Sequence, residues 1–217
     1  QCLESILMAL QIQKKWLIGA GKMETKIGVL ALQGGVAEHL NHLNQIENVR
    51  AVAVKKPEEL NSCLGLIIPG GESTTMRKLI KDYDFKKAIK DFNQQQKVIW
   101  GSCAGLILLA AEIEGENEEQ LALLDIKVKR NAFGSQLDSF IEKDIIPKVS
   151  TDPQELVFIR APLITEVAEN VEILYQKEDQ IAAVESENII ATSFHPELTD
   201  STIFHQYFIE KVKSLSN

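Results

Sequence analysis

Short apolar runs alternate with segments of helical periodicity in the first half of the chain. Residues 26–32 form a nearly continuous apolar run, which is typical of a strand buried on both faces of a parallel sheet. Residues 36–46 then carry apolar side chains at helical spacing. The same alternation predicts further strands at 50–54, 64–68 and 98–100, and helices at 74–80, 85–94 and 106–111. This rhythm indicates a doubly wound parallel sheet covered by helices.

The second half of the chain has a different pattern. Its predicted strands are short, with few helices between them, and a closing helix comes last: 125–129, 156–159, 171–175, 181–185 and 189–193, then 201–215. The acidic stretch 112–120 is interpreted as a solvated loop. We therefore expect a mixed or antiparallel extension of the sheet, within one domain that spans 23–217.

Length and charge narrow the classes of protein. The chain has 217 residues, enough for one well-buried α/β domain. Its net charge of −8 argues against nucleic acid or an anionic membrane as the main partner. The cysteines Cys2, Cys63 and Cys103 lie far apart without a C-x-x-C pair, so a reducing cytoplasm is expected. Cys63 is interpreted as an inert core residue.

Residues 1–22 differ from the rest of the chain. The apolar run 6–10 is too short to span a bilayer, and Lys14 and Lys15 interrupt the apolar residues after it. The charges come after the apolar run, the wrong order for a secretory signal. We interpret this stretch as a leader or an expression-derived extension, with Met23 as the natural start. A helix that contacts a partner is the alternative.

The pattern Gly-x-Cys-x-Gly at 101–105 lies between a predicted strand and a predicted helix. This is the cysteine version of a nucleophile elbow, a tight turn at which a β-carbon on either flanking glycine would clash. The turn sets Cys103 at the N-terminus of the next helix, where the helix dipole favours a thiolate. The alternative is a small buried cysteine at a crowded turn.

Two other loops come directly after predicted strands and carry polar groups. One is Pro-Gly-Gly-Glu-Ser at 69–73, and the other is His195-Pro196-Glu197. Because ligands bind beyond the carboxyl ends of the strands in open α/β sheets, we expect these loops and the Cys103 turn to meet at one crevice. Taken singly, each motif could be an ordinary turn or a capped loop.

Together the three loops suggest a cysteine hydrolase. Cys103 is the predicted nucleophile, His195 exchanges protons with it and with the leaving amine, and Glu197 orients His195. The backbone N–H groups of Ala104 and of the Gly70–Gly71 turn form the predicted oxyanion hole.

The remaining histidines give no metal site. His39 and His42 are three residues apart on a helix pattern, but no third ligand accompanies them at zinc-like spacing. We therefore expect a polar helix face there, and a surface position for His205 on the last helix. No metal and no organic cofactor are predicted.

Seven segments resemble one family. Gly-Ser-Cys-Ala-Gly, Pro-Gly-Gly-Glu-Ser and His-Pro-Glu together resemble the class I, triad-type glutamine amidotransferases. The longer strings resemble the glutaminase subunits of pyridoxal 5′-phosphate synthase: LALQG at 30–34, PGGESTTM at 69–76, CAGLILLA at 103–110, RNAFG at 130–134, QLDSF at 136–140, FIRAP at 158–162 and ATSFHPELT at 191–199. The resemblance covers nearly the whole chain after Met23.

The resemblance implies a flavodoxin-like three-layer sandwich that hydrolyses L-glutamine through a thioester on Cys103. The ammonia passes to a separate (β/α)₈-barrel synthase subunit, and the glutaminase works poorly until docked on it. By position, the residues implied to bind glutamine or shape the oxyanion hole are Gly71, Glu72, Ser73, Arg130, Ile159 and Arg160. An arginine fork suits the substrate carboxylate, although either arginine could instead order a loop. Gln33 falls near the expected subunit interface.

Two other interpretations stay open. One is a glutaminase that feeds a different synthase, such as an imidazole-glycerol-phosphate type, against which RNAFG and FIRAP argue. The other is a non-catalytic binding or stress-response protein on the same architecture. Such proteins can keep an elbow cysteine but lack the paired histidine and acid found at His195 and Glu197.

Overall fold

The computed structural model describes residues 24–117, 120–132 and 139–216. The predicted extension at 1–22 therefore lies outside the described residues, as do Phe133, Gly134 and most of the string at 136–140.

Five parallel strands form one half of a large central sheet. Their order is β2-β1-β3-β4-β12, with each neighbouring pair parallel. These strands are β1 (Thr25–Leu30), β2 (Val49–Val54), β3 (Gly65–Ile68), β4 (Val98–Ser102) and β12 (Ile189–Thr192). Every residue of β3, β4 and β12 is buried, which explains their continuous apolar runs.

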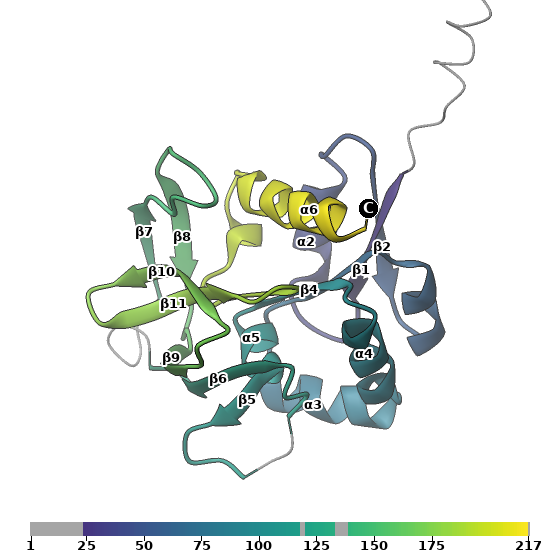
Figure 1. The fold of residues 1–217 in the computed structure, drawn as a ribbon, viewed down its shortest axis with the longest axis horizontal. Coiled ribbons are helices and arrows are strands. Elements are labelled where there is room, and N and C mark those ends of the chain that lie inside the picture. Colours follow the sequence, from purple (N-terminus) through teal and green to yellow (C-terminus); the bar gives the residue numbers. More distant parts are fainter. Residues whose placement is uncertain (1–23, 118–119, 133–138, 217) are drawn as a thin grey trace, which may run out of the picture.

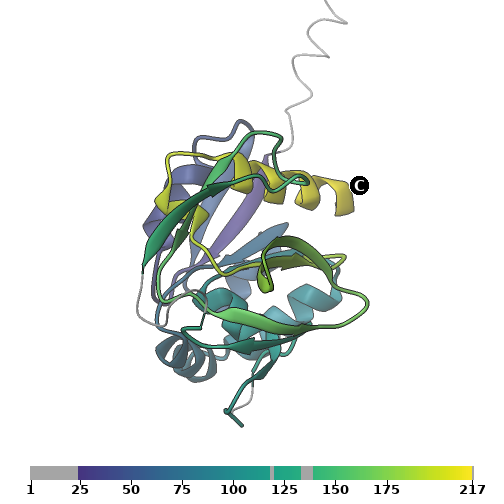
Figure 2. The ribbon, with the colours of Figure 1, turned by 90° about the vertical axis from the view of Figure 1, so that its left-hand side faces the viewer.

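Helices cover both faces of this sheet. α2 (Val36–Leu43) and α6 (Ile203–Leu215) lie on one face, and α3 (Ser73–Asp82), α4 (Phe85–Gln94) and α5 (Ala104–Leu109) lie on the other (Figure 1). Figure 2 shows the same layers after a quarter turn. Each face has its own apolar core, one including Phe85 and Phe92 and the other Trp100 and Phe208.

Mostly antiparallel strands extend the sheet beyond β12. β11 (Gln180–Glu185) pairs antiparallel with β12, and the order continues through β9 (Leu163–Val167), β6 (Leu124–Lys129) and β5 (Ala110–Ile113). β10 (Glu172–Lys177) pairs with β11, while β7 (Phe140–Asp144) and β8 (Gln154–Phe158) form a separate two-stranded sheet. Two short 3₁₀ helices complete the described elements, η1 (Pro57–Ser62) and η2 (Pro196–Leu198). The predicted flavodoxin-like sandwich with a mixed extension is confirmed.

Some elements differ from the sequence pattern. The helix predicted at 106–111 ends at Leu109, and Ala110–Ile113 continue as β5, so the predicted acidic loop loses its first two residues to a strand. The pattern did not predict β7 or β9. Both are short and half-exposed strands with few fully buried positions, so neither has a clear apolar run.

The polar helix face predicted for His39 and His42 and the surface position predicted for His205 are wrong. His39 and His205 are completely buried, and His42 is 8% exposed. Their rings contact one another between α2 and α6, with His39 Nδ1 2.9 Å from His205 Nε2. Burial is tolerated because each ring finds hydrogen-bond or ring partners inside the protein. Cys63 is buried, as predicted.

Within the described ranges, no helix is both long enough and apolar enough to cross a membrane. The same part of the chain contains no group of three or more metal-ligating side chains placed to hold an ion.

Candidate active site

Cys103 sits at a strained turn between β4 and α5. Its backbone φ of +47° lies in a region that residues other than glycine rarely adopt. The Cys103 N–H donates to the Thr192 carbonyl at 2.7 Å, which ties the turn to the end of β12. A β-carbon on Gly105 would lie 2.1 Å from the Ile68 carbonyl oxygen. Only glycine therefore lets α5 start this close to β3.

His195 and Glu197 come after β12 and form a buried pair. His195 Nδ1 lies 2.8 Å from Glu197 Oε1, and the His195 N–H donates to the Val157 carbonyl at 2.9 Å. Glu197 is only 3% exposed. Proline between the two residues starts the 3₁₀ helix η2 and fixes the backbone that aims both side chains.

The pair has strongly shifted protonation equilibria. Burial alone would lower the pKa of His195, but its contacts with Cys103 and Glu197 outweigh burial and raise that pKa to about 10. Burial would raise the pKa of Glu197, but the neighbouring imidazoles of His39 and His195 hold it below its ordinary value. His195 is therefore a cation at neutral pH, and it carries a proton that it can give to a leaving group.

The Gly70–Gly71 turn closes over this pair. The Gly70 N–H donates to Ser102 Oγ at 3.0 Å, and the Gly70 carbonyl accepts from the Gly35 N–H at 3.0 Å. A β-carbon on Gly70 would lie 2.4 Å from His195 Cε1. The turn can approach the imidazole this closely only because residue 70 is glycine.

Glu72 caps the helix that begins after the turn. Its carboxylate accepts from the Thr74 and Thr75 N–H groups at 3.0 and 2.7 Å. Hydrogen bonds from Thr75 and Thr74 lower the pKa of Glu72 to about 2. The Glu72 N–H in turn donates to Gln33 Oε1 at 2.9 Å. Through these hydrogen bonds Glu72 orders the end of the glycine turn and the start of α3.

Two arginines from the C-terminal half complete the site. Arg130 comes after β6 and forms ion pairs with Glu116 at 3.0 Å and with Glu72 at 3.6 Å. Arg160 comes after β8, is exposed, and has a strained φ of +44°. In the part of the chain that the structure describes, no carboxylate forms an ion pair with Arg160.

One cavity of about 510 Å³ brings all the predicted site residues together. Such a volume lies within the range of small-molecule pockets, about 300–1,000 Å³. The lining residues singled out from the sequence are Gln33, Gly71, Glu72, Ser73, Cys103, Ala104, Arg130, Ile159, Arg160, His195 and Glu197. The cavity thus combines a sulfur nucleophile with a cationic imidazole and two arginines. Such a set can cleave an amide or ester whose other end is anionic, because the sulfur attacks the carbonyl carbon and an arginine can bind the anion.

Comparison with known proteins decides the family. The model of the SNO glutamine amidotransferase family matches residues 29–214. The chain belongs to the SNO glutamine amidotransferase family. The family and the enzyme class predicted from the sequence are thereby confirmed.

Two relatives are matched over nearly their full length. The "Pyridoxal 5′-phosphate synthase subunit PdxT" of Clostridium beijerinckii is 52% identical over 185 residues, 85% of this chain and 97% of that protein. The protein of the same name from Clostridium botulinum is 49% identical over 186 residues, 86% of this chain and 96% of that protein. A crystal structure of a glutamine amidotransferase superposes with a TM-score of 0.81 at 39% identity, covering 86% of this chain and 98% of that one.

Two buried polar residues beside this family's expected triad were not predicted from the sequence. Ser102 Oγ accepts a hydrogen bond from the Gly70 N–H, and His39 Nε2 lies 3.5 Å from Glu197 Oε2. A usable signal exists for His39. It falls at helical spacing between Val36 and Leu43, on the apolar face of its helix, so a polar face was the wrong interpretation.

Proposed function

We propose that the chain hydrolyses L-glutamine to L-glutamate and ammonia at Cys103. The observation that carries the proposal is the cationic His195, held between Cys103 and the buried Glu197 at the edge of a cavity that fits an amino acid. No metal or organic cofactor takes part in this reaction, because the nucleophile, the acid and the base are all side chains.

The reaction proceeds in two stages. The Cys103 sulfur attacks the side-chain amide carbon of glutamine, and the tetrahedral intermediate collapses as the carbon–nitrogen bond breaks. His195 gives its proton to the leaving nitrogen, which departs as ammonia and leaves a thioester on Cys103. His195 then takes a proton from water, which attacks the thioester. The carbon–sulfur bond breaks and glutamate leaves. Glu197 orients His195 throughout and stabilises its cationic form.

Backbone donors stabilise the oxyanion of both stages. The Ala104 N–H at the first position of α5 has no partner within its helix. We assign it to the oxyanion hole together with the Gly71 N–H. We infer that docking of a partner selects the orientation of the Gly70–Gly71 peptide that aims this N–H at the substrate.

The rest of the cavity binds the amino-acid end of glutamine. We assign the α-carboxylate to Arg160, because Arg130 already pairs with Glu72 and Glu116. Gly71, Ser73 and Ile159 shape the wall around the substrate.

The ammonia goes to a synthase partner. Because the relatives are named as pyridoxal 5′-phosphate synthase subunits, we propose that this chain docks on the (β/α)₈-barrel subunit of that synthase and supports vitamin B6 synthesis. We place the complex in the cytoplasm, on the basis of the scattered cysteines.

Ammonia release from L-glutamine tests the proposal. The full chain is assayed alone and with a pyridoxal 5′-phosphate synthase barrel subunit, with Cys103→Ala as the control. We expect weak release alone, faster release with the barrel, and none from the variant. Fast release without the barrel, or none with it, would instead favour a glutaminase for another synthase. Equal activity of Cys103→Ala and its parent would refute a thioester at this cysteine.

A further inference from the structure

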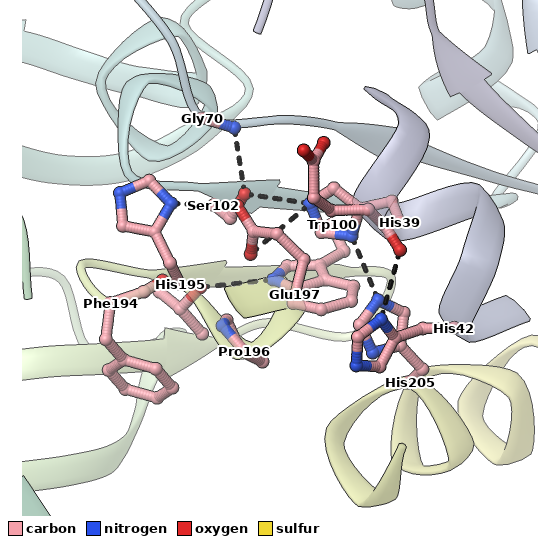
Figure 3. Close-up of polar contacts among 12 residues, drawn as sticks. His39, His42, Gly70, Trp100, Ser102, Phe194, His195, Pro196, Glu197 and His205 are labelled. Atoms are coloured by element: carbon pink, nitrogen blue, oxygen red, sulfur yellow. Dashed lines mark hydrogen bonds and ion pairs between the residues drawn. The ribbon is translucent and has the colours of Figure 1, made fainter. Parts of the chain in front are cut away.

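His39 lies directly behind the proposed catalytic triad, although it belongs to helix α2 on the other side of the Cys103 turn. Its side chain is completely buried. Its Nε2 lies 3.2 Å from Ser102 Oγ and 3.5 Å from Glu197 Oε2, and its Nδ1 lies 2.9 Å from His205 Nε2 (Figure 3). The rings of His39 and Trp100 pack in a T-shaped arrangement, with their planes at 88°. The ring therefore has one fixed orientation.

The contacts around His39 favour one of its two neutral tautomers. Burial lowers the pKa of His39 despite the nearby Glu197 charge, so the ring is neutral and carries one N–H. Glu197 Oε2 is buried and has no hydrogen-bond partner among the described residues, and His39 Nε2 faces it at 3.5 Å. A carboxylate oxygen can only accept, so a proton on Nε2 suits this contact. We therefore assign the His39 proton to Nε2, where it faces Glu197 and Ser102, and this makes Nδ1 the acceptor from His205 Nε2–H. In this assignment His205 Nδ1 is unprotonated, and it has no hydrogen-bond partner in the described part of the chain.

Through these contacts His39 touches both supports of the reacting groups. Glu197 uses Oε1 to hold His195 and turns Oε2 toward His39. Ser102 uses its hydroxyl oxygen to hold the Gly70 N–H. Gly70 in turn lies against the His195 ring and Cys103. One imidazole therefore links the acid of the triad to the glycine turn.

We propose that His39 is a positioning residue, which holds Glu197 in the rotamer that orients His195 and holds Ser102 on the Gly70 turn. The inference rests on the proposed glutaminase function. Without His39, the buried Oε2 of Glu197 loses the ring nitrogen that faces it at 3.5 Å, so the Glu197 side chain can rotate away from His195. Misplacing a catalytic group by about 1 Å can cost about a hundredfold in rate.

The test compares three single variants of the full chain in the barrel-supported ammonia assay. His39→Leu removes the donor, and His39→Gln keeps one near Glu197. His42→Leu is the matched control, because His42 is buried on the same helix but lies 3.0 and 2.9 Å from the carbonyls of Glu38 and Thr199 instead of Glu197 or Ser102.

We expect His39→Leu to lower kcat by about tenfold to a hundredfold with KM changed by less than about twofold. His39→Gln is expected to recover kcat to within about threefold of the parent. His42→Leu should lower the unfolding temperature about as much as His39→Leu does, while its kcat stays near that of the parent. Equal losses of kcat in both leucine variants, or a folded His39→Gln as slow as His39→Leu, would overturn the proposal.

Two further measurements keep the test decisive. If His39→Leu does not fold, Ser102→Ala replaces it, and an unchanged kcat in that variant counts against the link to Gly70. The proton NMR signal of the His195 Nδ1–H reports its bond to Glu197 without any substrate. We expect this signal to broaden or vanish in His39→Leu and to persist in His42→Leu. Its persistence in His39→Leu refutes the positioning role, even where the parent releases no ammonia and the proposed function itself has failed.

Discussion

At the scale of single residues, the protonation of His195 sets the chemistry. In an unfolded chain its imidazole has a pKa near 6.5, and in the folded protein that pKa is raised to about 10. The folded state therefore binds the His195 proton more tightly. This contribution to stability is fully present below pH 6.5 and is lost as the pH rises toward 10.

Replacement of Cys103 by serine tests this origin of the shift. The variant removes one of the two contacts that outweigh burial, so we expect the pKa of His195 to fall toward its ordinary range. The titration is followed through the Cε1–H NMR signal of His195 in the parent and in Cys103→Ser. A midpoint near 10 in both proteins would assign the whole shift to Glu197.

Single functional residues were predictable only where they belong to a recognisable local sequence motif. The motifs around Cys103 and His195 name their residues directly, since a tight turn demands glycines and an oriented imidazole demands a nearby acid. Ser102 and His39 have no such motif. Their polar atoms meet only after α2 packs beside β4 and η2, so local sequence could not predict the contact.

At the scale of elements, the helix α3 depends on its cap. Glu72 satisfies two backbone N–H groups that have no partner within the helix. Because its pKa is lowered to about 2 from an ordinary 4.5, its contribution to stability is present above pH 4.5 and lost as the pH falls toward 2.

We expect Glu72→Ala to lower the free energy of unfolding by about 1 kcal/mol, a typical cost for loss of a helix cap. Urea unfolding at pH 7 measures this value, with the exposed Glu58 replaced by alanine as the control. The difference between Glu72→Ala and its parent should shrink as the pH is lowered below 4.5. A difference that does not change with pH would show that the carboxylate is not what stabilises the cap.

The boundary between α5 and β5 illustrates what periodicity cannot separate. Residues 106–110 are buried throughout, so the apolar run has neither a helical nor an alternating pattern at its end. The change from helix to strand comes from pairing with β6, with Ala110 opposite Leu124. This partner is distant enough in the sequence that no window around Ala110 contains its signal.

At the scale of the whole molecule, the cavity joins the two halves of the chain. The parallel strands carry Cys103, His195 and the glycine turn at their carboxyl ends, as the strand pattern predicted. Arg130 and Arg160 come from the mostly antiparallel half, after β6 and β8. Their arrival at the same cavity was implied by family resemblance alone, because antiparallel strands have no common carboxyl edge.

This division of labour predicts different effects for the two arginines. We expect Arg160→Gln to raise KM for L-glutamine by about tenfold or more, because the variant loses the proposed charged hydrogen bond to the α-carboxylate of the substrate. Arg130→Gln should lower stability as well, since it leaves Glu116 and Glu72 without their shared cation. Steady-state kinetics and thermal unfolding of both variants separate the roles. A larger rise in KM for Arg130→Gln would reverse the assignment.

The parallel pairing of β4 with β12 also has a consequence for the order of folding. The hydrogen bond between Trp100 and Thr192 joins residues 92 positions apart, and contacts across such long loops close late. During synthesis the N-terminal part of the chain emerges first, so Cys103 leaves the ribosome well before the strand that brings its base. Onset of glutaminase activity therefore marks docking of the last strand, and a nascent chain that stops short of it carries a nucleophile with no base beside it.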